Sequence, residues 1–90
     1  MNEKELIKKL EGEGFKDLRV CPIEQNFNSG EHTHDERTVH IILTGELTIS
    51  DKNGTKTFHP GDRVEFPAGT KHNAKSSKKG SMIVGVKHKL

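Results

Sequence analysis

The chain contains no tryptophan and no tyrosine, and Cys21 is its only cysteine. Hydrophobic residues make up 29% of its 90 positions, which is little material for a core. A single cysteine excludes an internal disulfide. Small domains with so thin a core are usually stabilised by a metal ion or a partner subunit when a disulfide is excluded. The composition therefore predicts one domain that depends on a metal, on dimerisation or on both.

Positive and negative side chains are also nearly balanced in number. The formal net charge is +2, and the one locally basic segment, residues 71–80, has no aromatic residue for stacking on bases. We therefore expect no nucleic acid as a partner. No run approaches the roughly 20 apolar residues of a membrane span, and the first ten residues lack the core of a signal peptide. A cytoplasmic protein without a membrane partner is the expectation.

Turn residues divide the chain into short segments. A helical pattern that ends at Gly14 predicts a short N-terminal helix within residues 1–14. Beyond it, short β-branched runs alternate with turns, of which Asn53–Gly54 is the strongest hairpin signal. About eight short strands at a spacing of about 8–12 residues are typical of an all-β sandwich or barrel. We expect a small antiparallel barrel over residues 15–90.

Three of the six histidines fall within nine residues, at His32, His34 and His40. On a β-strand, the side chains of His32 and His34 would point to the same face, about 7 Å apart. Convergent imidazoles suit a transition-metal ion, which binds nitrogen donors at about 2.0–2.1 Å. The alternative is that these rings line a barrel as polar residues satisfied by water or hydroxyls.

A second motif follows, made of Gly61, Pro67, Gly69 and His72 at the spacing G-x5-P-x-G-x2-H. With GEHTHDERTVHIILTG at residues 30–45, it resembles the two motifs of the cupin superfamily, in order, over most of residues 26–86. The resemblance implies a conical jelly-roll barrel, often dimeric, in which the two motifs face each other. It also implies that His72 joins His32 and His34 as a metal ligand.

The resemblance fails at one ligand. The family's first motif has a glutamate ligand at the position of Thr38, and a hydroxyl is a poor ligand for a divalent ion. His40 lies two residues further along and should face the same side. It could supply a fourth donor, carry a proton near a substrate, or fill the barrel. We predict a site made of His32, His34, His72 and His40 for a divalent ion, one of Fe, Mn, Zn, Ni or Cu.

Such a site leaves coordination positions open to a small molecule. A neutral ligand in place of a carboxylate leaves the ion with more positive charge, which favours anionic ligands. Three-histidine cupins include dioxygenases, so the resemblance implies an oxidoreductase acting on a small substrate as one hypothesis. The others are a non-catalytic module that binds or senses a small ligand, and a metal-free structural cupin. No catalytic residue is assigned.

The most β-branched run, residues 38–43, raises the question of assembly. If alternate residues from Thr38 face the lumen, then Val39, Ile41 and Leu43 form an outward apolar stripe. That stripe needs cover from the N-terminal helix, the opposing sheet or a second subunit. With the resemblance, it leads us to expect a homodimer.

Overall fold

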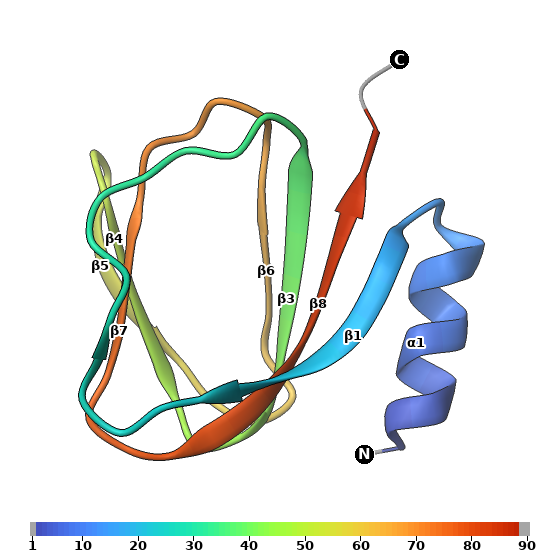
Figure 1. Ribbon diagram of the computed structural model, residues 1–90, viewed down its shortest axis with the longest axis horizontal. Helices are drawn as coiled ribbons and strands as arrows, with labels where there is room; N and C mark the ends of the chain where they lie inside the picture. The colour runs from blue at the N-terminus through green and yellow to red at the C-terminus, as the bar shows by residue number, and fades with distance from the viewer. Residues whose placement is uncertain (1, 89–90) are drawn as a thin grey trace.

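The computed structural model describes residues 2–88 as two antiparallel sheets that face each other, with one helix outside (Figure 1). The elements are α1 (Glu3–Gly12), β1 (Lys16–Ile23), β2 (Phe27–Asn28), β3 (Arg37–Thr44), β4 (Leu47–Asp51), β5 (Gly54–Phe58), β6 (Arg63–Phe66), β7 (Asn73–Ser76) and β8 (Gly80–Lys87). The predicted all-β jelly-roll barrel with a short N-terminal helix is confirmed.

Each sheet has four strands. The helix-side sheet has the order β1-β8-β3-β6, and the far sheet has the order β2-β7-β4-β5. Two segments carry the chain between the sheets at one end of the barrel (Figure 1): the first crossing segment, residues 29–36, joins β2 to β3, and the second crossing segment, residues 67–72, joins β6 to β7. The first holds His32 and His34, and the second holds His72.

The space between the sheets, the lumen, is filled mainly by apolar side chains. Its buried members are Ile23, Ile42, Leu47, Ile49, Phe66 and Ala74, and Phe27, Phe58, Val64 and Met82 pack against them. Strand alternation accounts for this set, because every second residue of a half-buried strand turns inward. Thr38 pairs with Phe66, and His40 pairs with Val64. Thr38 and His40 therefore face the lumen, as the alternation predicts.

A second core lies on the outer face of the helix-side sheet. Its buried members are Leu10, Phe15, Val39, Ile41 and Ile83, with Leu6, Ile7, Leu18 and Leu43 packed against them. The predicted outward stripe is thus covered by α1, which lies against this sheet in Figure 1. The helix begins at a cap in which the Asn2 side chain accepts a hydrogen bond from the Glu5 N–H. The stripe needs no second subunit, and the expected homodimer rests on the family resemblance alone.

Replacing Leu10 by alanine is expected to lower the free energy of unfolding by about 3 kcal/mol, within the range of roughly 2–5 kcal/mol for such truncations. Leu10 is fully buried and joins α1 to the outer core, so the change leaves a cavity between helix and sheet. Urea denaturation measures the loss. Lys9→Ala, an exposed change on the same helix, serves as the control. A loss below about 1 kcal/mol for Leu10→Ala would show that α1 does not cover the sheet as described.

Candidate metal centre

The two crossing segments bring three of the predicted histidines together. One ring nitrogen each of His32, His34 and His72 lies within 4.8 Å of the others. The ring centroids of His32 and His72 are 4.4 Å apart, and those of His32 and His34 are 4.8 Å apart. Two of the rings come from one segment and the third from another, 38 residues beyond His34 in the chain (72 minus 34). Folding therefore completes a donor set that neither segment provides alone.

Backbone hydrogen bonds hold the segments side by side. The N–H of His32 donates to the carbonyl of His72 at 2.9 Å, and the N–H of His72 donates back at 3.0 Å. The N–H of Gly69 also donates to the carbonyl of His34 at 2.9 Å. These bonds make a short antiparallel bridge across the end of the barrel. Main-chain hydrogen bonds thus fix the spacing between the two segments that carry the rings.

Two of the rings are also oriented by a backbone carbonyl. The Nδ1 of His32 lies 2.9 Å from the carbonyl of Gly30, and the Nδ1 of His72 lies 3.2 Å from that of Thr70. A carbonyl accepts only, so each Nδ1 carries the proton and donates it. The lone pair of each ring then lies on Nε2. This is the arrangement that metal-binding histidines commonly have, in which one nitrogen is anchored and the other is presented to the ion.

Burial favours the neutral form of His34 and of His72. It is the main cause that lowers the pKa of His34 and of His72 below the ordinary value of 6.5. The nearby His32 lowers both pKa values further, whereas Asp35 acts in the opposite direction on His34. A neutral imidazole is the form that binds a metal, because protonation removes the lone pair. At neutral pH His34 and His72 therefore present nitrogen donors and carry no charge.

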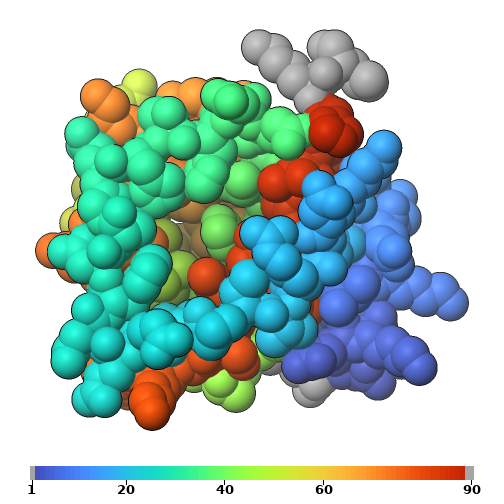
Figure 2. All heavy atoms as spheres, viewed as in Figure 1, coloured from blue at the N-terminus to red at the C-terminus, as the bar shows by residue number. Residues whose placement is uncertain are grey.

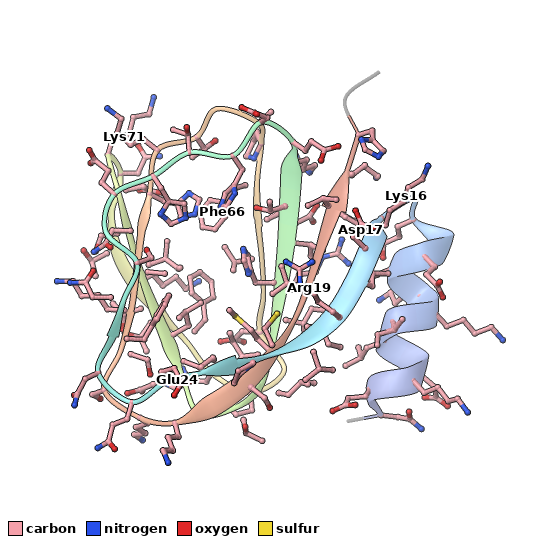
Figure 3. The ribbon with its side chains drawn as sticks, viewed as in Figure 1. Lys16, Asp17, Arg19, Glu24, Phe66 and Lys71 are labelled. Carbon is pink, nitrogen blue, oxygen red and sulfur yellow. The ribbon has the colours of Figure 1, made fainter. Side chains whose placement is uncertain are left out.

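Phe66 fixes the position of the most buried ring. Its side chain stacks on His72 with centroids 3.8 Å apart and planes 6° from parallel. Figure 3 shows Phe66 inside the barrel, beside imidazole rings. His72 is only 2% exposed, so stacking on one face and the Thr70 carbonyl at its edge leave the ring little freedom. The strand pattern in the sequence gives no indication that Phe66 meets this imidazole, so the contact could be found only in the structure.

The fourth predicted ligand, His40, faces the lumen but lies outside the group of mutually close nitrogens. Its ring centroid is 6.0 Å from that of Phe66. Its Nδ1 is buried, and no described residue provides a hydrogen-bond partner for it. Burial, followed by the neighbouring His72, His34 and His32, lowers the pKa of His40 from 6.5 to about 4. His40 is therefore a neutral imidazole close to the site.

The other polar residues near the motifs do not join the group. Thr38, at the position of the family's glutamate, is 3% exposed, and its hydroxyl has no hydrogen-bond partner among the described residues. Glu36 contacts His88. His59 and His88 are exposed. Among residues 2–88, the donor set at this end of the barrel therefore consists of imidazoles without a carboxylate.

Comparison with known proteins places the chain in a family. Residues 20–86 match the family model for the cupin domain. That match covers most of the chain, and the protein therefore belongs to the cupin superfamily. Among curated proteins, none matches this chain.

Solved structures agree on the fold. A cupin-2 domain protein from Shewanella frigidimarina has a TM-score of 0.70 at 19% identity, over 79% of this chain and 69% of that one. A Cupin 2 conserved barrel protein from Salinispora arenicola has a TM-score of 0.69 at 26% identity, over 79% and 61% of the two chains. A DMSP lyase from Ruegeria pomeroyi has a TM-score of 0.72 at 21% identity, over 81% and 38%. The chain thus spans about two thirds or less of these relatives.

The one helix in the described residues 2–88 is too short and too polar to span a membrane.

Proposed function

We propose that this small cupin binds one divalent transition-metal ion through His32, His34 and His72 and uses it to hold a small molecule in the lumen. The observation that carries the proposal is the convergence of three ring nitrogens within 4.8 Å of one another. The carbonyls that anchor Nδ1 of His32 and His72 support it, because they leave Nε2 of each ring with its lone pair.

The chemistry of the donor set limits which ions fit. Imidazole nitrogens suit Fe, Zn, Ni and Cu, and an all-nitrogen set favours copper and zinc by affinity. Mn remains in the predicted group but prefers oxygen ligands. An ion held by three protein ligands has open positions and acts as a Lewis acid on whatever small molecule occupies them.

His40 remains a candidate fourth donor. It faces the lumen next to Phe66, and its low pKa keeps the lone pair available at neutral pH. If it stays outside the coordination sphere, the same neutral nitrogen accepts a hydrogen bond from a bound molecule. In either role it contributes to the lumen without adding charge.

No catalytic residue is assigned, because the lumen-facing positions of the helix-side sheet hold no carboxylate and no described residue gives the Nδ1 of His40 a proton-transfer partner. Holding a small ligand therefore agrees with the site more directly than a particular reaction does. The oxidoreductase hypothesis stays a prediction, and oxygen uptake with small acids and thiols would test it.

The protein purified without an affinity tag is expected to bind close to one equivalent of zinc. The apoprotein is loaded with excess Zn²⁺, passed through a desalting column and analysed for metal by mass spectrometry. Copper, nickel, iron and manganese are loaded in parallel, because the ion with the highest affinity need not be the ion used in the cell. Retention of less than about a tenth of an equivalent of every ion would end the metal proposal and leave a structural cupin.

A further inference from the structure

Arg19 lies on β1, outside both histidine-bearing motifs, and these motifs do not indicate which way its side chain points. The strand register pairs Arg19 with Val84, Val84 with His40, and His40 with Val64, in one row across the helix-side sheet. Val64 packs against the core between the sheets. The whole row therefore faces the lumen, and Figure 3 shows the Arg19 side chain on the barrel side of β1, away from α1.

A β-bulge gives Arg19 this direction. Lys16 pairs with Val86 and Arg19 with Val84, so Asp17 and Leu18 together lie opposite one residue, Gly85. Regular alternation from Lys16 would turn Leu18 inward and Arg19 outward. With the extra residue, Leu18 packs into the outer core and Arg19 turns to the lumen side of β1, where its side chain stays exposed to solvent. Bulges often redirect a side chain next to a functional site.

The backbone of this bulge is unusual for a side-chain-bearing residue. Asp17 has a φ of 54°, in the left-handed region that mainly glycine adopts. The Nη1 of Arg19 donates to the carbonyl of Asp17 at 3.0 Å, so the bulge also anchors one side of the guanidinium. A Cβ on Gly85 would lie 2.5 Å from Cδ2 of Leu18, so a larger residue opposite the bulge would force the Leu18 side chain to move. The local sequence thus supports an arrangement that presents Arg19 inward.

The charge of Arg19 is not balanced by an acidic neighbour. Within residues 2–88, no ion pair involves Arg19, in contrast to Arg37 and Arg63 on the outer face, which both bind Glu65. Its guanidinium has five N–H donors, and the Asp17 carbonyl accepts from one of them. Arg19 is also among the groups that lower the pKa of His40, after burial and the three other histidines. Its positive potential therefore reaches the lumen.

The side chain lies at an opening of the barrel. β1 and β2 are edge strands of their sheets. Figure 2 shows a hollow in this face of the molecule, bordered by β1 and by the first crossing segment. A small molecule that enters here meets β1, which carries Arg19, on one side and the segment that carries His32 and His34 on the other. The entrance thus has a cation on one wall and histidine rings on the other.

We infer that Arg19 selects the ligand of the histidine site and that this ligand is a small organic acid. Its carboxylate binds the Arg19 guanidinium, and a second polar group at its other end lies against the histidines. A guanidinium matches a carboxylate through two parallel N–H···O bonds, which a neutral amide cannot reproduce with the same strength. The inference rests on the proposed function, since the histidines and their ion provide the second contact.

The test compares acids with neutral analogues in the zinc-loaded protein. Malonate and succinate are titrated by calorimetry, with malonamide and succinamide as matched probes. The wild-type protein is expected to bind at least one acid about tenfold more tightly than its diamide. Arg19→Gln should weaken that preference clearly, because only the preference due to the metal ion remains, and should leave the zinc content unchanged. Arg19→Lys should restore part of the lost preference. Arg37→Gln, which removes the same charge from the outer face, should bind as the wild type does.

The outcomes separate this inference from the metal proposal. Two results would overturn the role of Arg19 while the metal site stands. In the first, zinc binds but Arg19→Gln prefers acids over diamides as strongly as the wild type does. In the second, zinc binds but neither acid binds at millimolar concentrations. If zinc does not bind, the same acids and diamides are titrated into the zinc-free protein, and these titrations test the role of Arg19. An acid preference that depends on Arg19 then upholds the carboxylate contact without the metal, and its absence overturns it.

Discussion

Replacing His32 and His34 together by alanine is expected to abolish zinc retention and to lower the affinity for Zn²⁺ by about 100-fold or more, equivalent to roughly 3 kcal/mol. The two rings supply two of the three nitrogens that converge within 4.8 Å. The one remaining imidazole of the converging group, His72, cannot hold an ion against water and buffer, even if His40 joins it, because His40 lies outside that group. Both side chains are only half-buried and lie outside the two apolar cores, so the fold should persist. Competition with a chromophoric chelator measures the affinity.

A matched double variant makes this result specific. His59→Ala combined with His88→Ala also removes two of the six histidines. The side chains of His59 and His88 are 63% and 58% exposed, and neither belongs to the converging group. This variant should bind zinc as the wild type does. Equal losses in the two double variants would show that the assignment of ligands is wrong.

Acidification is expected to destabilise the zinc-free protein through His40. Its pKa is about 4 in the folded chain, against an ordinary value of 6.5. Between these pH values the unfolded chain binds a proton at this residue and the folded chain does not. The stability associated with a neutral His40 is therefore complete above pH 6.5, falls as the pH drops, and is lost once the pH has passed about 4. The expected loss is roughly 2–4 kcal/mol, because one pKa unit corresponds to about 1.4 kcal/mol. His34 and His72, whose pKa values are also lowered, act in the same direction.

The measurement is urea denaturation of the zinc-free protein at several pH values between 7 and 4, for the wild type and for His40→Gln. Glutamine keeps a polar side chain in the lumen but does not titrate. The difference in stability between the two proteins should shrink or reverse in favour of the variant as the pH falls. Parallel curves for the two proteins would mean that the burial of His40 does not affect its protonation.

The elements of the fold could be predicted because their signals are local. The helix lies within the predicted residues 1–14, and the hydrophobic alternation of residues 38–43 gives the correct inward and outward faces. The hairpin at Asn53–Gly54 also forms, but one residue earlier than the signal indicated, because Asp51 pairs with Gly54 and leaves Lys52 and Asn53 as the turn. The Asp51 side chain accepts a hydrogen bond from the Asn53 N–H and so stabilises that position.

Features that depend on distant segments could not be derived in the same way. The sequence left open whether a helix, a sheet or a second subunit covers Val39 and Ile41, and only the packing of α1 answers this. Alternation predicts that His40 faces the lumen, but it does not give the distances across the lumen that separate His40 from the other three histidines. The inward direction of Arg19 depends on a bulge at Asp17, where no glycine in the sequence indicates a bulge. A regular strand pattern therefore places Arg19 on the outer face, which is wrong.

The most direct test is an anomalous difference map at the zinc absorption edge, from crystals of the untagged protein grown with Zn²⁺. We expect a single strong peak between the two crossing segments, about 2.0–2.1 Å from one nitrogen each of His32, His34 and His72. A peak elsewhere, or those rings turned away from one another with no density between them, would contradict the proposed centre while leaving the barrel itself intact.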